Sequence, residues 1–514
     1  MGVKENEIVF MFLLNTPQTV ATMYAINNIG AISEWYNASG MTVELMRHDL
    51  MENHIRFMVI CDVIYPLVKQ AIPGTDVEKV IVVPVKGIFN VESQDEYFIS
   101  WDTFIQQFGI GKTYNKAEYA DGKTTLIVHT GGTSGVVKRI AMSDYNINSF
   151  VYKASLMPFN FQPDDSFCQL IPPMVAWSLA GIHLSRFYKM LMYLIPNYDK
   201  DQFVDIMLST RANHYFTVPA FVKTLIENPK LENSDLSFLK SINHGGESLS
   251  PEDDRRIDDE LLKHGATIKN RLGFGQNEEF ACFTANLDIP GCPKEYGCCG
   301  IPLIGNDLLI IDPRTQKVLP IGMNQNGTYN IGELHITGDT VMSGYYGKDA
   351  ALNSQVFRMI DNKRFFNTGD QAYIDENGKL WFATRDSRII RKRNGGKVFA
   401  NVLEEIINGI PYVKESCVVA APNGKDKDTS CHMVLHESIY DLPKEDQDII
   451  IEKIIAQIEE QCRSLYTYYM PDTYKFHKQG FPLTSFGKVD YKLLEAENVK
   501  EVTAYGGKLP KIRY

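Results

Sequence analysis

The sequence has no apolar run long enough to cross a membrane. Its longest runs, such as residues 81–85, have the length of a buried strand, whereas a membrane helix needs about 20 apolar residues. The apolar stretch at residues 8–14 follows two glutamates and precedes no small-residue cleavage site, so a signal peptide is not expected. We therefore expect a cytoplasmic protein without integral membrane contact.

The chain also lacks a surplus of basic residues. Its 52 Lys and Arg residues against 63 Asp and Glu residues give a formal net charge of -11. Such a chain has no general attraction for nucleic acid or for an anionic membrane. Any phosphate that it binds must therefore be held locally by a few aimed groups.

A disulfide framework is absent as well. The nine cysteines are an odd number and lie scattered along 514 residues, which is typical of reduced thiols. Cys292, Cys298 and Cys299 lie close together, but no second cysteine pair or histidine pair completes a zinc pattern. No metal site is expected there, and the chain contains no internal repeat or low-complexity segment.

The hydrophobic patterning predicts an α/β fold. A chain of this length exceeds one compact core, so two or more domains are expected. Short apolar runs alternate with helical patterns, which favours largely parallel sheets covered by helices. The expected strands include residues 80–85, 126–129, 167–171 and 214–218, and the expected helices include residues 201–211 and 220–227.

The pattern changes towards the C-terminus. From about residue 330, segments such as 332–338 and 379–384 indicate short antiparallel strands and a β-rich subdomain. A smaller α+β region follows, with a helix expected over residues 449–462. We predict a large N-terminal domain over residues 1–386 and a small, mobile C-terminal domain over residues 387–514.

A glycine-rich segment follows the expected strand at residues 126–129. It reads Thr-Gly-Gly-Thr-Ser-Gly-Val-Val-Lys from Thr130 to Lys138. The glycines allow close approach of an anion, and the hydroxyl groups and the lysine can bind phosphate oxygens. The spacing differs from a Walker A motif. The segment alone leaves a phosphate loop and an ordinary surface turn open.

Three further loops carry groups suited to a nucleotide. Phe274 precedes Gly275 and can stack on a base, and Glu278 can hold Mg²⁺. Asp370, in the segment Asn-Thr-Gly-Asp, can accept hydrogen bonds from ribose hydroxyls. Lys488 lies in a Gly/Thr loop near the C-terminus, where it can meet a reacting carboxylate. Each loop alone is also compatible with a solvated carboxylate, a turn-capping Asp or a surface lysine.

Taken in order, these segments resemble the adenylate-forming superfamily of acyl-CoA synthetases, peptide-synthetase adenylation domains and luciferases. The resemblance covers almost the whole chain, from about residue 2 to residue 494. The matching segments are residues 130–138 (family T-S-G-T-T-G-x-P-K), 245–247 (G-G-A), 274–278 (Y-G-x-T-E), 332–345 (G-E-L-x-I-x-G…G-Y), 367–370 (R-T-G-D), 395–398 (G-x-x-V) and 482–488 (P-x-T-x-x-G-K).

The resemblance implies an ATP-dependent enzyme that forms an acyl-AMP and then an acyl-CoA. Its substrates would be a carboxylic acid, ATP and CoA, with Mg²⁺ as cofactor, in a setting such as fatty acid metabolism. By the resemblance, Lys488 would bridge substrate carboxylate and α-phosphate, beside Asn277 and Glu278, with Glu278 also binding Mg²⁺. The residues implied in ATP and AMP binding are Thr130, Gly131, Gly132, Thr133, Ser134, Gly135, Lys138, Gly246, Glu247, Phe274, Gly275, Asp370 and Arg385.

The family also implies an acyl pocket and a swinging C-terminal domain. The pocket would be lined by Trp177, Phe216, Phe221, His244, Gly245 and Gly273. Ser387 would lie at the hinge, and Gly395 would face the thiol channel, where a side chain would block a pantetheine arm. The segment expected to hold an α-ammonium group contains no Asp, so an apolar aliphatic or aryl acid is favoured over an amino acid.

Several positions depart from the family pattern. Val137 replaces the loop proline, Asn277 replaces a threonine and Ser387 replaces an Asp or Lys. The chain also begins at a point that relatives usually precede with a further segment. Two alternatives therefore stay open: loading of a carrier-protein phosphopantetheine, and a non-catalytic nucleotide-binding descendant. The sequence leaves the specific acid and the oligomeric state undetermined.

Overall fold

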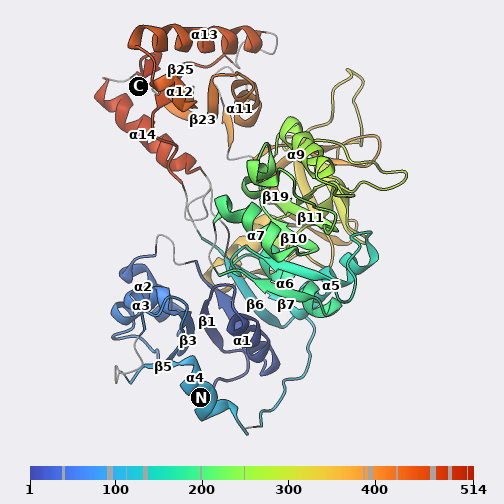
Figure 1. Ribbon diagram of the computed structural model, residues 1–514, viewed down its shortest axis with the longest axis vertical. Coiled ribbons are helices and arrows are strands. Elements are labelled where there is room, and N and C mark those ends of the chain that lie inside the picture. Colours follow the sequence, from blue (N-terminus) through green and yellow to red (C-terminus); the bar gives the residue numbers. More distant parts are fainter. Residues whose placement is uncertain are drawn as a thin grey trace.

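The structure is a computed structural model of the 514-residue chain. It describes all residues except 38–40, 90–95, 112, 131–136, 197–198, 248, 386–387, 392–396, 424–425, 464–469, 484–488, 506–507 and 514. Figure 1 shows three parts along the long axis: the N-terminal strands at one end, a second α/β layer in the middle, and the elements from α11 onward at the other end.

The first sheet is mostly parallel. Its order among the described residues is β17-β7-β6-β2-β1-β3-β4-β5, with β7 antiparallel to both neighbours. The strands are β1 (Ile8–Phe12), β2 (Ile32–Trp35), β3 (Phe57–Cys61), β4 (Lys79–Val83), β5 (Phe98–Ser100), β6 (Thr124–His129), β7 (Arg139–Ser143) and β17 (Gly344–Tyr345). Helices α1 (Pro17–Asn28), α2 (Val43–Glu52) and α3 (Tyr65–Ala71) accompany it.

Alternate side chains of β1 explain why this strand is apolar throughout. Val9 and Met11 lie in the core shared with the second sheet, whereas Phe10 and Phe12 lie in a separate core with α2 and α3. Side chains alternate between the two faces of a strand, and a parallel strand covered on both faces is apolar at every position.

The second sheet has the order β14-β13-β12-β11-β10-β8-β9. Its members are β8 (Ser166–Gln169), β9 (Leu191–Leu194), β10 (His214–Thr217), β11 (Ser241–Gly245), β12 (Arg271–Phe274), β13 (Thr284–Ala285) and β14 (Ile301–Pro302). The first five in sequence are parallel, and β13 and β14 are antiparallel. Helices α5 (Asp144–Leu156) and α6 (Ala176–Tyr188) lie between the two sheets (Figure 1).

The opposite face of the second sheet is covered by α7 (Phe203–Thr210), α8 (Pro219–Val222) and α9 (Pro251–Lys263). The helix expected over residues 220–227 is wrong in extent. It ends at Val222 and continues as a 3₁₀ turn, Lys223–Leu225, before Glu227 adopts a left-handed backbone with φ 53°.

A third sheet is antiparallel, as the sequence indicated. It consists of β15 (Asp307–Ile311), β16 (Gly332–Thr337), β18 (Phe357–Ile360), β19 (Lys363–Ile374) and β20 (Leu380–Arg385). The expected α/β fold with largely parallel sheets and a β-rich part is therefore confirmed.

The C-terminal elements have their own core. They are β21 (Ile389–Arg391), β22 (Lys397–Phe399), α11 (Ala400–Asn408), β23 (Val413–Asn423), β24 (Asp426–Leu435), α12 (Glu437–Tyr440), α13 (Lys444–Arg463), β25 (Thr473–His477), α14 (Tyr491–Ala504) and β26 (Ile512–Arg513). Helix α13 contains the helix expected over residues 449–462. The expected domain boundary falls on residues 386 and 387, outside the described residues, and stays a prediction.

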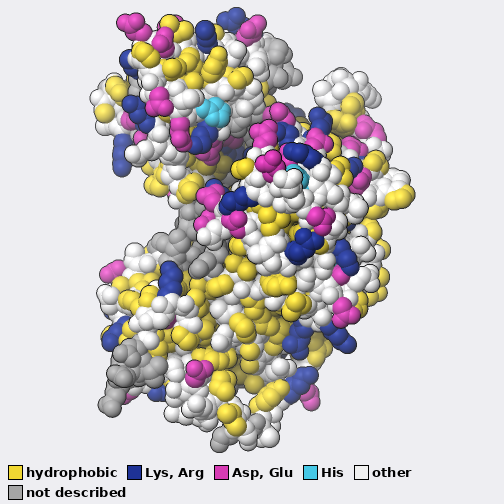
Figure 2. Space-filling view, in the orientation of Figure 1, with side chains coloured by type: hydrophobic (Ala, Val, Ile, Leu, Met, Phe, Trp, Pro, Cys, Tyr) yellow, Lys and Arg dark blue, Asp and Glu magenta, His cyan; other side chains and the backbone are white. Residues whose placement is uncertain are grey.

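The described surface and helices show how charged and apolar side chains are distributed. On the face drawn in Figure 2, Lys and Arg side chains are mixed with Asp and Glu side chains and do not gather into one patch. Among the described residues, no helix combines the length and apolarity needed to cross a membrane. The nine cysteines are free thiols.

A buried charge network anchors the loop after β13 to α9. Lys294 Nζ lies 2.7 Å from Asp254 Oδ1 and 2.8 Å from Asp258 Oδ2, and the three side chains are at most 2% exposed. Asp258 also accepts hydrogen bonds from the backbone and side chain of Asn270, which in turn binds His244 Nε2. The network therefore connects α9 to β11 and to the start of β12.

Lys294→Met should lower the free energy of unfolding by about 3–5 kcal/mol, because it leaves two buried carboxylates without their cation. Lys263→Met is the matched control on α9, where the lysine is 65% exposed and pairs with Glu260; its effect should stay within about 0.5 kcal/mol. Urea unfolding measures both changes. Equal effects of the two substitutions would contradict the assigned role of Lys294.

Candidate active site

The candidate site lies where β11 and β12 end, at the carboxyl edge of the second sheet. The turn after β12 begins at Gly275, where an added Cβ would lie 2.1 Å from the carbonyl oxygen of Ala281. Only glycine fits this close approach of two backbones. Phe274, expected to stack on adenine, is partly buried at the end of β12.

Asn277 ties this turn to two other segments. Its Nδ2 donates to His129 O at 2.8 Å, at the end of β6, and its Oδ1 accepts from the backbone N–H of Ala176 at 3.0 Å, at the start of α6. The Asn277 amide thereby holds the turn against His129, the residue immediately before the expected phosphate loop.

The strands that flank the expected phosphate loop are clamped by one buried carboxylate. Glu34, which is fully buried, lies 2.9 Å from His129 Nε2 in β6 and 2.6 Å from Arg139 Nε in β7. Burial alone would raise the pKa of Glu34, but His129 and Arg139 hold it below its usual range. The loop itself, with Gly131, Gly132, Thr133, Ser134 and Gly135, lies outside the described residues.

The described residues at the two ends of that loop, Thr130 and Lys138, lie near the turn after β12. The backbone N–H of Lys138 donates to Thr130 Oγ1 at 2.8 Å. Lys138 Nζ lies 3.1 Å from Tyr345 OH, which donates to Glu278 Oε1 at 3.2 Å. The structure thus brings Lys138 and Glu278 together through Tyr345, a residue that the sequence identified only as part of a motif.

Asp370 and Arg385 face each other across β19 and β20. Arg385 Nε lies 3.0 Å from Asp370 Oδ1, and Gln276 Nε2 donates to Asp370 Oδ2 at 2.6 Å. The Asp370 side chain is fully buried, whereas Arg385 is 41% exposed. Gln276 belongs to the turn after β12, so the expected ribose-binding Asp lies beside the expected adenine-binding Phe. Sequence reasoning gave Gln276 no role.

Buried carboxyl groups concentrate here. Burial raises the pKa of Glu278, and the Lys138 charge and the Tyr345 hydroxyl only partly oppose this. The neighbouring Glu279 is fully buried, and burial followed by the charges of Glu278 and Asp370 raises its pKa well above the usual range. Its carboxylate oxygens have no well-formed hydrogen bond among the described residues, although the backbone of Gln276 acts in the opposite direction and lowers the pKa of Glu279.

A site with several buried carboxyl groups is suited to binding a divalent cation. Mg²⁺ prefers oxygen ligands and is commonly held by one or two carboxylates together with substrate phosphates. Glu278 supplies an oxygen donor whose pKa burial raises, and a bound cation would lower that pKa. The donor set therefore suits the metal that the sequence led us to expect.

An apolar cavity opens beside this site. Its lining residues are Phe150, Ala154, Phe159, Phe161, Trp177, Leu184, Phe216, Asn243, Arg271, Leu272, Gly273, Cys282 and Ala285. Trp177 stacks on Phe216 with ring centroids 4.1 Å apart, and Trp177 Nε1 donates to Thr217 O at 3.0 Å. The expected acyl-pocket residues Trp177, Phe216 and Gly273 thus line one cavity, and Gly245 is paired with Gly273 at its edge.

Two expected pocket residues lie elsewhere. Phe221 packs in the core on the opposite face of the sheet, against Phe203. His244 points to that face too, where it pairs with Asn270, and burial lowers its pKa to about 4. Strand alternation explains this, because Asn243 lines the cavity and the next residue, His244, points to the opposite face of the sheet.

The remaining expected site residues are placed as follows. Gly246 has φ +86° and follows β11 directly with Glu247, as expected for a turn. Ser387, Gly395 and Lys488 lie outside the described residues.

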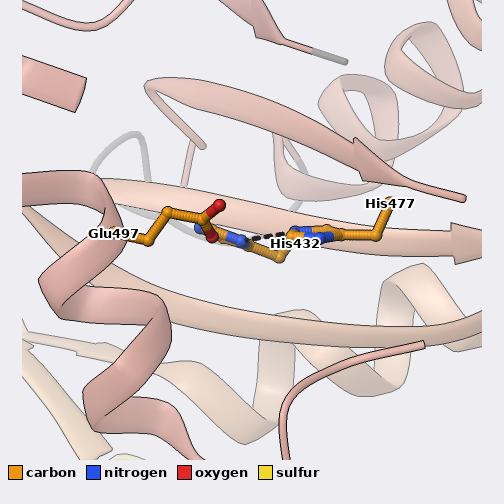
Figure 3. A group of neighbouring side chains, drawn as sticks. All are labelled: His432, His477 and Glu497. Atoms are coloured by element: carbon orange, nitrogen blue, oxygen red, sulfur yellow. Dashed lines mark hydrogen bonds between the residues drawn. The ribbon is translucent and has the colours of Figure 1, made fainter. Parts of the chain in front are cut away.

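A separate cluster in the C-terminal sheet contains groups that can bind metals. Figure 3 shows His432 of β24, His477 of β25 and Glu497 of α14, whose ligand atoms lie within 4.8 Å of one another. His432 Nδ1 lies 2.9 Å from His477 Nε2, and Glu497 is already paired with Lys475 at 2.5 Å. Burial and nearby cations, Arg513 and Lys475 among them, hold the pKa of His432 well below its usual range. These cations oppose a metal ion, and the cluster serves to hold the sheet and α14 together.

Comparison with known proteins decides the family. Residues 1–346 match the family described as AMP-binding enzyme. The chain belongs to the AMP-binding enzyme family. It is 27% identical over 441 residues to probable 4-coumarate–CoA ligase 1 of Dictyostelium discoideum, covering 82% of this chain and 75% of that protein. It is 23% identical to the long-chain-fatty-acid–CoA ligase of Bacillus subtilis, covering 96% and 86%.

Among solved structures, ATP-bound MatB from Rhodopseudomonas palustris has the same fold as this AMP-binding enzyme. The TM-score is 0.78 at 20% sequence identity, over 96% of this chain and 89% of that one. At this identity the likeness concerns the fold, and it agrees with the α/β architecture predicted from the sequence.

Glu279→Gln should stabilise the folded protein more at high pH than at low pH. A carboxyl group whose folded pKa is raised contributes stability below its unfolded pKa and loses it as the pH rises towards the folded pKa. The gain of Glu279→Gln over the parent protein should therefore grow as the pH rises above the ordinary glutamate pKa of 4.5, by up to about 1.4 kcal/mol per pH unit.

Chemical unfolding at several pH values measures this difference. Glu452→Gln, on the exposed face of α13, is the matched control and should show no such trend. A Glu279→Gln difference that stays constant with pH would show that Glu279 is ionised in the folded protein.

Proposed function

We propose that this AMP-binding enzyme joins a carboxylic acid to ATP, releases pyrophosphate, and then passes the acyl group from AMP to the thiol of CoA. The observation that carries this proposal is the convergence at the end of β12. There, Gln276, Asp370 and Arg385 form one cluster, and Lys138, Tyr345 and Glu278 form another, both beside an aromatic cavity.

The first step needs a nucleotide held at both ends. Asp370 offers carboxylate oxygens to the ribose hydroxyls, in exchange for part of its present bonding with Gln276 and Arg385. Phe274 at the end of β12 offers an aromatic ring to adenine, next to the Gly246–Glu247 turn. Lys138 and the hydroxyl groups and glycines of the segment from Thr130 onward would bind the phosphates.

In the adenylation step a carboxylate oxygen of the acid attacks the α-phosphorus, and the bond to pyrophosphate breaks. We assign Lys488 to the meeting point of these two anions, where its charge offsets their repulsion. Glu278 would hold Mg²⁺, which supplies charge neutralisation for the leaving pyrophosphate. Asn277 keeps the turn that carries Glu278 fixed against β6 and α6.

In the second step the CoA sulfur attacks the acyl carbon, the thiol proton is released and AMP leaves. We infer that residues 387–514 form a small domain that turns about Ser387 between the two steps and brings Gly395 to the thiol channel. Free CoA is favoured as acceptor over a carrier-protein phosphopantetheine by the curated relatives, which are named as CoA ligases. The free thiols favour a reducing, cytoplasmic setting.

Pyrophosphate release from ATP and Mg²⁺ across a panel of carboxylic acids, with and without CoA, tests both steps. We expect release that requires an acid and rises with CoA, and Lys488→Ala should slow it by about 10²–10³-fold. Acid-dependent release that ignores CoA would contradict the thioester step and favour carrier loading. Absence of release with every acid would contradict the adenylation step and favour a non-catalytic nucleotide-binding protein.

Asp370→Asn tests the nucleotide contact separately. Loss of a charged acceptor for the ribose should raise the KM for ATP about 10- to 100-fold, equivalent to about 1.5–3 kcal/mol. The KM for the acid should change little, because the cavity is untouched. Asp312→Asn, at a turn outside the site, is the control for the substitution. An unchanged KM for ATP in Asp370→Asn would remove Asp370 from the nucleotide site.

A further inference from the structure

The register of three parallel strands determines which residues lie at each depth of the acyl cavity. Gly245 of β11 pairs with Gly273 of β12 next to the turn that holds the nucleotide groups. Two residues deeper, Phe216, Asn243 and Arg271 lie side by side on β10, β11 and β12. Since a strand advances about 3.3 Å per residue, this second row lies about 7 Å further into the sheet.

The two rows differ in chemistry. The outer row consists of glycines, so no side chain obstructs the entrance here. A larger residue does not fit at position 245, because an added Cβ would lie 2.4 Å from Gly273 O. The inner row offers an aromatic ring, an amide and a guanidinium group. Apart from Asn243 and Arg271, the lining side chains carry no charged or amide group.

Arg271 has few partners for its five N–H donors. Within the part of the chain that the structure describes, Arg271 makes one hydrogen bond, from Nη1 to Phe159 O at 3.4 Å, and no carboxylate lies within ion-pair distance of it. Asp288 attracts it from farther away but is itself paired with Lys269 at 2.9 Å. Burial lowers the pKa of Arg271, as expected for a cation that lacks a close counter-charge.

The other charges near this end of the cavity are already matched. Asp165 pairs with both His214 and Lys240. Asp165 is therefore already engaged and is not available as a counter-charge for Arg271, and the Arg271 charge helps to lower the pKa of His214. A partly desolvated guanidinium facing an otherwise apolar cavity is costly unless an anion joins it.

We propose that Arg271, with the amide of Asn243, binds a second carboxylate at the far end of the acid substrate. The preferred substrate class is then a dicarboxylic acid, with one carboxylate activated at the nucleotide and the other held by a planar guanidinium. This inference rests on the proposed function and narrows it, because the sequence alone favoured a purely apolar acid.

The test compares matched acids: adipate with hexanoate, and terephthalate with 4-methylbenzoate, together with shorter and longer dicarboxylates from succinate to suberate. The parent enzyme should prefer the best dicarboxylate over its matched monoacid by about 10- to 100-fold in kcat/KM. Arg271→Met should invert this preference, mainly through the KM for the diacid. Arg271→Lys should keep part of it, since it retains the charge but loses the bidentate geometry.

Arg314→Met, at an arginine that is 87% exposed, is the matched control and should leave the preference unchanged. Efficient turnover of monoacids with an unchanged ratio in Arg271→Met would overturn this inference and leave the proposed function intact. If no acid releases pyrophosphate, the proposed function fails, and calorimetric titration of the diacids still decides the inference. Diacid binding that Arg271→Met abolishes would support it, and equal or absent binding in both proteins would overturn it.

Discussion

Glu278, Glu279 and Asp370 lie buried within electrostatic range of one another, and Lys138 and Arg385 are the cations that act on them. Each uncompensated charge in such a place costs several kcal/mol. Three features limit this cost: Arg385 and Gln276 bind Asp370, Tyr345 links Glu278 to Lys138, and the raised pKa of Glu279, caused by burial, favours its neutral form. These contacts come from separate parts of the chain, so the site exists only when both sheets and the antiparallel layer are assembled.

The need to compensate these buried carboxyl charges also accounts for the structure of the turn after β12. The close approach at Gly275 brings the acidic residues back against the sheet, and Asn277 fixes the turn to β6 and α6. The buried chain from Lys294 through Asp258 and Asn270 to His244 supports β11 and β12 from the other face. Polar contacts therefore hold the part of the site proposed to bind the nucleotide, whereas aromatic packing around Trp177 and Phe216 forms the part proposed to bind the acid.

Local sequence was sufficient for the α/β class and for most strands, because hydrophobic periodicity is a local signal. The loops that meet at the site were identified by the resemblance of their order to a family, since each loop alone left other interpretations open. Local sequence could not show which face of β11 looks into the cavity, so His244 was expected in the pocket while Asn243 lines it. The phase of a strand depends on what packs against each face.

Other features could not be found from local patterns. Tyr345 reaches Lys138 across 207 positions of the chain, and no short motif encodes that contact. Arg271 belongs to none of the recognised segments, and its importance follows from the cavity around it. The helix expected over residues 220–227 failed because a helical pattern does not reveal the left-handed turn at Glu227 that ends the segment.

The central claim is that this site forms and holds an acyl-adenylate. Calorimetric titration with non-hydrolysable acylsulfamoyl adenosines, in benzoyl and adipoyl forms, tests it most directly, with AMP and each free acid as references. We expect at least one analogue to bind more than about 100-fold tighter than AMP, because it engages the Asp370 cluster and the aromatic cavity together. Binding no tighter than AMP for both analogues would contradict the claim, since it would show that the two halves of the site do not act on one ligand.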